Sequence, residues 1–151
     1  VSFVNRPVLL ADKQIDLPPA QLKTPGYSVY LLDTEVKSPT APLVRLFLDK
    51  MKDKFFEERF RSEFLPSNDL AIQSLLTGQT RELFKQLSLL SAFQIEYLKE
   101  MIPAHFRQIV GDLLGAGIPV KLLGSGGGGF LLAFVPEGVT FPEKVKSLQV
   151  T

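Results

Sequence analysis

A run of glycines near the C-terminal end is the feature that most limits how this chain can fold. Five of the six residues in the segment 124–129 are glycine, and the sixth is Ser125. Ordering one glycine costs roughly 0.5–1 kcal/mol more than ordering one alanine, so an ordered loop of this composition is costly to form. Because a hairpin turn needs only about two to five residues, the excess indicates that another group approaches this backbone closely.

Apolar segments at 118–123 and 130–135 flank the run and predict two adjacent antiparallel strands. A flexible linker is the weaker interpretation, since linkers usually adjoin polar residues. Consecutive amide N–H groups favour an anion such as phosphate as the approaching group. The dinucleotide-binding and Walker A patterns do not fit, because the first must open a helix and the second needs lysine in place of Phe130. The glycine-rich loop of protein kinases does not fit either, because too little sequence follows it for a catalytic loop.

The N-terminal part of the chain predicts strands and then a long helix. A hairpin is expected within residues 2–17, followed by a proline-rich loop and a central strand over 27–33. Apolar positions repeat every four residues after that strand, which predicts one helix from about 40 to 60. We expect Ser38 or Thr40 to cap its N-terminus.

The second half predicts further helices around the two glycine-flanking strands. Breaks at 65–68 and at Pro103 separate the expected helices, which span 69–76, 80–101 and 104–114. Thr140 and Glu143 predict a capping box that opens a short final helix. The fold class expected from this order is α+β, with an antiparallel sheet, helices packed on one face and an N-terminal hairpin.

Composition excludes several functional classes. The 151 residues suit one domain, and 17 Lys+Arg against 16 Asp+Glu give no positive surface for binding nucleic acid. No apolar run approaches the ~18 residues of a membrane span. The chain has no cysteine and one histidine, His105, so we predict no thiol chemistry and no metal site. A cytoplasmic protein is expected, since missing cysteines are compatible with a reducing compartment.

Two segments resemble motifs of the GHMP kinases, a superfamily of small-molecule kinases. Residues 121–130, KLLGSGGGGF, resemble the third motif of that superfamily, K-L-x-G-[AS]-G-G-G-G-x. Residues 32–44, LDTEVKSPTAPLV, resemble the mevalonate kinase pattern [VL]-D-T-G-V-x-x-x-T-x-x-L-V, with Glu35 in place of the glycine. The resemblance implies that 25–151 form a ferredoxin-like C-terminal domain, and that 1–24 form a hairpin and linker returning from an N-terminal domain outside this sequence.

The resemblance also implies a function, most like that of mevalonate kinase in isoprenoid biosynthesis. Such an enzyme transfers a phosphoryl group from MgATP to a substrate hydroxyl. Thr40 and Ser125 would contact the substrate. Catalytic residues and Mg²⁺ ligands are expected upstream of Val1, so this chain alone is expected to be inactive. The loop residues implied to border the ATP phosphates are Gly124, Ser125, Gly126, Gly127 and Gly128.

We interpret the other residues that could take part in binding or catalysis as structural. We interpret Lys121 as a solvated strand residue, with a phosphate contact as the alternative. Asp33 is interpreted as a turn-forming carboxylate and His105 as a surface residue. The alternative functions are a heptose or fucose kinase of the same superfamily and a non-catalytic binding module. Expected partners are ATP, a small-molecule substrate and the N-terminal domain, and a homodimer is also compatible with the sequence.

Overall fold

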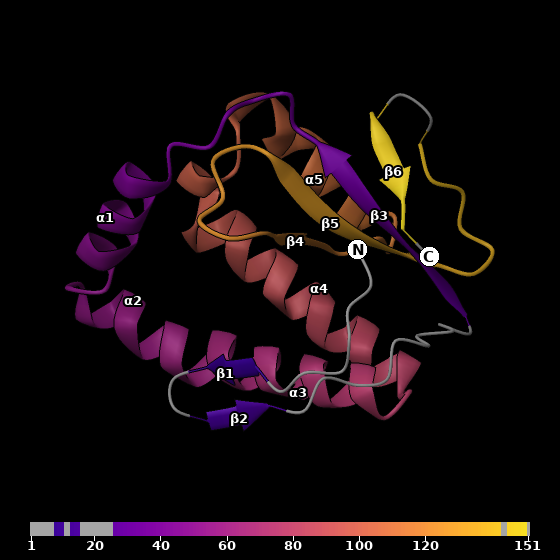
Figure 1. The fold of residues 1–151 in the computed structure, drawn as a ribbon, viewed down its shortest axis with the longest axis horizontal. Coiled ribbons are helices and arrows are strands. Elements are labelled where there is room, and N and C mark those ends of the chain that lie inside the picture. Colours follow the sequence, from indigo (N-terminus) through magenta and orange to yellow (C-terminus); the bar gives the residue numbers. More distant parts are fainter. Residues whose placement is uncertain (1–7, 11–12, 16–25, 143–144, 151) are drawn as a thin grey trace.

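A four-stranded antiparallel sheet forms the centre of the molecule. The computed structural model describes residues 8–10, 13–15, 26–142 and 145–150. The strands lie in the order β4-β5-β3-β6, so the two long strands are in the middle (Figure 1). Their bounds are Tyr27–Asp33 for β3, Val120–Leu122 for β4, Phe130–Pro136 for β5 and Ser147–Gln149 for β6. The predicted α+β class with an antiparallel sheet is confirmed.

The pairing of β3 with β5 fixes the register of the sheet. It runs without interruption from Tyr27 opposite Pro136 to Asp33 opposite Phe130. Both strands are rich in aromatic and aliphatic side chains, which suit a pleated surface. Their last pair therefore brings the end of β3 to the end of the glycine run.

The predicted final helix is wrong. Residues 140–142 are not helical, Glu143 lies outside the described residues, and β6 follows instead. Leu148 pairs with Leu31 of β3, so β6 satisfies backbone groups that would otherwise line an open edge. This long-range pairing outweighs the local capping pattern at Thr140.

Helices surround the sheet. The predicted single helix over 40–60 is interrupted after Lys50, where Asp53 accepts hydrogen bonds from the backbone N–H groups of Phe55 and Phe56 and starts a new helix. This N-cap explains the interruption, because its side chain replaces the missing intrahelical partners. The helices are α1 (Thr40–Lys50), α2 (Lys54–Arg59), η1 (Phe60–Phe64), α3 (Leu65–Leu76), α4 (Thr80–Tyr97), η2 (Lys99–Met101), η3 (Ala104–Phe106) and α5 (Arg107–Gly115).

The predicted break at 65–68 is also wrong, because α2, η1 and α3 follow one another directly. The segment η1 is a π-helix in which the Leu65 N–H donates to the Phe60 carbonyl, five residues earlier. Pro66 then falls in the first turn of α3, where its missing N–H is tolerated. The π turn thus lets a proline sit within one long helical stretch.

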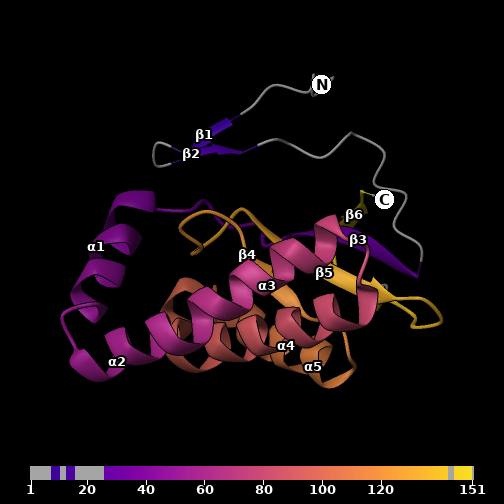
Figure 2. The same ribbon diagram turned by 90° about the horizontal axis from the view of Figure 1, so that it is seen from below.

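The helices contact both faces of the sheet, so the expectation of helices on one face was too simple. Leu32 of β3 packs with Val110 and Leu113 of α5 in one cluster of buried residues. Tyr27, whose side chain lies on the other face of β3, packs with Leu83 of α4 in a second cluster. Figure 2 shows α3 and α4 running along each other beside the sheet.

The helix α4 also covers the edge strand β4. The Val120 N–H donates to Ser91 Oγ at 3.2 Å, and the Leu122 N–H donates to Gln94 Oε1 at 2.7 Å. Both polar side chains are buried. Because an unpaired buried N–H is costly, these two side chains stabilise the strand that leads into the glycine run.

The N-terminal hairpin is confirmed where the structure describes it. Strands β1 (Val8–Leu10) and β2 (Lys13–Ile15) pair antiparallel, with Val8 opposite Ile15. The rest of the predicted 1–24 hairpin and linker lies outside the described residues. Among the residues described, no helix combines the length and apolar composition that crossing a membrane requires.

Candidate functional site: the glycine loop

The glycine loop, residues 124–129, connects the antiparallel strands β4 and β5. In Figure 1 it is the orange segment that turns toward the N-terminal end of α1. Gly124, Gly126, Gly127 and Gly129 have φ values of 60° to 75°, in the left-handed region that favours glycine. The loop conformation therefore requires glycine at several positions.

The close approach predicted from the glycine excess is present, and the groups that approach are parts of the protein. A Cβ added at Gly126 would lie 2.6 Å from the Met101 carbonyl oxygen, and one at Gly128 would lie 2.4 Å from the Val36 carbonyl oxygen. A Cβ at Gly127 would overlap the side chain of Leu43 in α1. These three glycines let the loop pack against its own domain.

Several loop amides are bound to protein carbonyls and do not face a ligand. The N–H groups of Gly126, Gly127 and Gly129 donate to Leu123, Met101 and Val36. Within the described part of the chain, no acceptor lies on the N–H groups of Gly124, Ser125 or Gly128. A Cβ at Gly124 would meet nothing within 4 Å. Any anion would therefore be held at the start of the loop.

The segment after β3 holds the other end of the loop. The Thr34 N–H donates to the Gly129 carbonyl at 2.9 Å, next to the Gly129 N–H bond to Val36. Glu35, between these two contacts, has a φ of 57° and is the only described non-glycine residue with positive φ. The Glu35 position thus has the backbone conformation of a glycine, and glycine is the residue that the mevalonate kinase pattern has there.

Asp33 is a turn-forming carboxylate, as predicted. Its Oδ1 accepts a hydrogen bond from the Glu35 N–H at 2.9 Å. The Lys146 ammonium group lies 3.2 Å from Asp33 and 2.8 Å from Glu35. The Glu35 N–H first, and Lys146 second, hold the pKa of Asp33 below its ordinary value. These interactions stabilise the turn that carries Thr34.

Ser38 connects the loop to the start of α1. Its hydroxyl donates to the Gly126 carbonyl at 2.5 Å and lies 3.4 Å from the Ser125 hydroxyl. The predicted cap at Ser38 or Thr40 is wrong, because Pro39 occupies the N-cap position without a side-chain hydrogen bond and Thr40 is the first helical residue. The contact of Ser38 with the loop was not predicted, because no local pattern in the sequence signals it.

The two predicted substrate residues lie on adjoining segments of this site. Ser125 is half-buried and lies beside Ser38. Thr40 is exposed and follows Ser38 by two residues in the chain. Because Pro39 supplies no side-chain cap, the first-turn amides of α1 are not capped from that position. Hydroxyls and backbone N–H groups therefore meet where the glycine loop faces α1.

Lys121 and His105 border the site without entering it. Lys121 is half-buried on β4, so its interpretation as a solvated residue is wrong, and burial lowers its pKa. His105 is exposed as predicted, yet its Nε2 lies 3.1 Å from the Thr34 carbonyl oxygen. Both residues therefore adjoin the segments that hold the glycine loop.

The described residues contain no cluster of three His, Cys, Asp or Glu side chains suited to a metal ion. A groove of about 320 Å³ along α4 is lined by other residues than those of the glycine loop. Comparison of the chain with protein-family models, with curated proteins and with solved structures found no match.

Proposed function

We propose that this chain is the C-terminal domain of an ATP-dependent small-molecule kinase of the GHMP type, most like mevalonate kinase. The complete enzyme would be cytoplasmic and would transfer a phosphoryl group from MgATP to a hydroxyl group of a small acid. The sheet with its surrounding helices would be the ferredoxin-like domain of that superfamily. Residues upstream of Val1 would supply the catalytic groups, so the chain alone would not catalyse the reaction.

One observation carries the proposal: the two segments that resemble kinase motifs contact each other. Residues 34–38 and 124–129 are joined by Thr34 to Gly129, Gly129 to Val36 and Ser38 to Gly126. The two segments are about 90 positions apart in the sequence, so their contact does not follow from either resemblance. Their meeting at one site supports a shared role, and the left-handed backbone of Glu35 supports the match at the one position where the residue differs.

The loop fits an anionic group at one end. The amides of Gly124 and Ser125 lack acceptors within the described residues, and the space beside Gly124 is open. Amides in this arrangement suit a phosphate oxygen. In the proposed enzyme these groups would border the transferred phosphate, while Ser125 and Thr40 would position the acceptor substrate. Gly126, Gly127 and Gly128 would fix the shape of the loop by their contacts with the protein.

The described residues do not fit a magnesium ion. The carboxylates nearest the loop, Asp33 and Glu35, are both paired with Lys146. Phosphoryl transfer depends mainly on positioning and on neutralising charge, and this domain would contribute positioning.

The alternative functions are a heptose or fucose kinase, and a stand-alone binding module. The glycine loop does not separate mevalonate kinases from sugar kinases, because the sequence G-x-G-G-G-G-F-L-L suits both. The segment 32–44 favours the mevalonate type. A homodimer is compatible with either kinase.

ATP turnover by the complete protein tests the proposal. The complete protein, including any upstream sequence, would be assayed with mevalonate and with a panel of sugars that contains fucose and a heptose. We expect mevalonate phosphorylation, and we expect it to fall in Ser125→Ala and in Thr40→Ala, while Thr77→Ala, at the C-cap of α3, leaves it unchanged. Sugar phosphorylation without mevalonate turnover would select the alternative kinase. A folded complete protein that phosphorylates neither would overturn the kinase proposal.

A further inference from the structure

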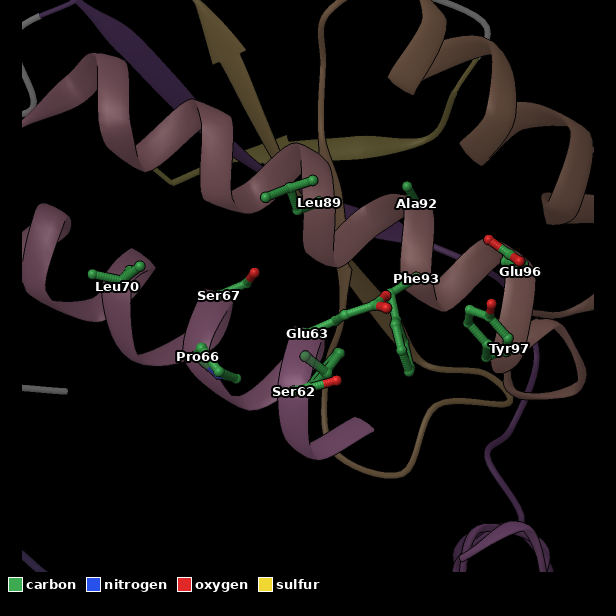
Figure 3. Close-up of a pocket in the computed structure, with 11 residues that line it drawn as sticks. Ser62, Glu63, Pro66, Ser67, Leu70, Leu89, Ala92, Phe93, Glu96 and Tyr97 are labelled. Carbon is green, nitrogen blue, oxygen red and sulfur yellow. The ribbon is translucent and has the colours of Figure 1, made fainter. Parts of the chain in front are cut away.

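A groove of about 320 Å³ lies between the η1–α3 stretch and α4, away from the glycine loop. Figure 3 shows its two sides, with Pro66, Ser67 and Leu70 opposite Leu89, Ala92 and Phe93. Its floor includes Phe93 and Ser67, which are 5% and 8% exposed. At one end lie Leu70 and Leu89, which are 44% and 51% exposed. This end of the groove is apolar.

The other end is acidic. Glu63 and Glu96 both line it, together with Tyr97 (Figure 3). Glu63 is paired with Arg59 at 2.9 Å, whose guanidinium group also lies over the Tyr97 ring, 5.2 Å from its centroid. Glu96 has no ion-pair partner among the residues described. Arg59 is nevertheless close enough for its charge to interact with Glu96 as well. Two carboxylates therefore share one guanidinium group, and this end of the groove keeps a net negative charge.

Two further acceptors lie at the acidic end. A hydrogen bond to Glu96 raises the pKa of Tyr97, so the phenol keeps its proton and its oxygen retains acceptor capacity. Pro66 has no N–H, so the Ser62 carbonyl four residues earlier cannot accept the bond that an α-helix would give it. Ser62 lies in the π-helical segment η1, and π turns within α-helices occur frequently at functional sites.

We propose that this groove binds a small organic cation in which a primary ammonium group is attached to a short apolar body. The ammonium group would lie between Glu96 and the Ser62 carbonyl, because it offers three donors to an end that is rich in acceptors. The apolar body would cover Phe93 and Leu89. The volume lies at the lower end of the range for small-molecule sites, which is about 300–1,000 Å³.

This site is independent of the proposed kinase function. The groove shares no lining residue with the glycine loop or with the segment 34–38. An anion would be repelled by the net negative charge of Glu63, Glu96 and Arg59, and a neutral molecule would leave that charge uncompensated. Charge therefore separates the proposed occupant from an uncharged or acidic one of the same shape.

Titration of the ¹⁵N-labelled 151-residue chain with phenethylammonium, followed by NMR, tests the proposal. The neutral comparator is 2-phenylethanol and the anionic one is phenylacetate. We expect phenethylammonium to bind most tightly and to shift amide signals of Ala92, Phe93 and Glu96. Equal or tighter binding of the alcohol would show an unselective apolar groove and overturn the proposal. Tighter binding of phenylacetate, or shifts confined to other residues, would overturn it as well.

Matched variants test the role of charge. Glu96→Gln should weaken phenethylammonium binding about two- to fivefold, the size expected for an exposed ion pair, and should leave 2-phenylethanol binding unchanged. Glu58→Gln removes the same charge from α2 outside the groove and should leave binding of both probes unchanged. Equal effects of the two variants would contradict a site at Glu96. The unfolding midpoint of each variant should match the parent, and Ala92→Leu, which fills the groove, should weaken both probes.

Discussion

The carbonyl oxygen of Gly129 accepts two hydrogen bonds from Thr34, one from the backbone N–H at 2.9 Å and one from the hydroxyl at 2.8 Å. Thr34 is completely buried, so neither donor has access to water as an alternative. These two hydrogen bonds to one acceptor join the end of β3 to the end of the glycine loop.

Replacing the Thr34 hydroxyl by a methyl group should destabilise the domain. Thr34→Val keeps the shape of the side chain and removes one of the two donors, so we expect the free energy of unfolding to fall by about 1–2 kcal/mol. Thr77→Val is the matched control, because the Thr77 hydroxyl donates to Gln73 within one exposed helical turn. Its effect should stay within about 0.5 kcal/mol. Equal losses in urea denaturation would contradict a special role for Thr34.

Alanine substitutions should separate two kinds of loop glycine. Gly124→Ala places a methyl group in open space at a φ of 60°, so we expect only the left-handed backbone cost of about 1–2 kcal/mol. Gly128→Ala places a methyl group 2.4 Å from the Val36 carbonyl oxygen, which must move. We expect a further loss of about 1–3 kcal/mol there. Denaturation of both variants measures the difference, and equal stability would show that the loop moves freely away from Val36.

Substitutions of Glu35 can test whether its positive φ lowers the stability of the domain. Glu35→Gly and Glu35→Ala both remove the exposed ion pair with Lys146, which is worth little. Only glycine also relieves the cost of a φ of 57°. We therefore expect Glu35→Gly to be about 1 kcal/mol more stable than Glu35→Ala. A thermal unfolding curve for each variant measures this, and an alanine variant at least as stable as the glycine one would contradict the strained conformation.

Gln94 should be necessary for the edge of the sheet. Gln94→Leu leaves the partly buried Leu122 N–H without its acceptor, so we expect a loss of about 1–3 kcal/mol. Gln73→Leu on the exposed side of α3 is the control and should be nearly neutral. Amide hydrogen exchange at Leu122 should accelerate in Gln94→Leu alone. Unchanged protection at Leu122 would show that the bond is dispensable.

Lys121 should make stability depend on pH in the alkaline range. Burial lowers its pKa, so the folded state disfavours the charged form. This penalty is present at neutral pH and disappears as pH rises above the ordinary lysine pKa of about 10.4. We expect Lys121→Met to be more stable than the parent at pH 7, with the advantage shrinking as pH approaches 11. A constant advantage across that range would show that packing, rather than charge, causes it.

The sequence predicts the parts of the fold that depend on regular apolar patterns. The strand 27–33 is predictable because it is rich in β-forming residues, and the strand after the glycines because residues 130–135 are a continuous apolar run. β6 was missed because only three residues pair, and their place is set by Leu31 on a distant strand. Pro66 predicted a break in the helix because proline usually ends one. The π-helical segment that accommodates Pro66 here has no local sequence signal.

The candidate site was likewise predictable only in part. The glycine run indicated a closely approached backbone, and the structure contains that approach at Gly126, Gly127 and Gly128. The approaching groups could not be predicted, because Met101 and Val36 are distant from the loop in the sequence and local patterns do not report long-range contacts. Ser38 was missed for the same reason, since its contact with Gly126 spans 88 positions in the sequence.

The long-range contacts of the glycine loop have a consequence for the order of folding. Its bonds to Met101, Val36 and Ser38 all close large stretches of chain, and closing a stretch costs entropy before any bond rewards it. We therefore expect the loop to gain its shape only after β3, β5 and the start of α1 have assembled. Damage to the loop should shorten the lifetime of the folded domain while leaving the speed of its formation almost unchanged.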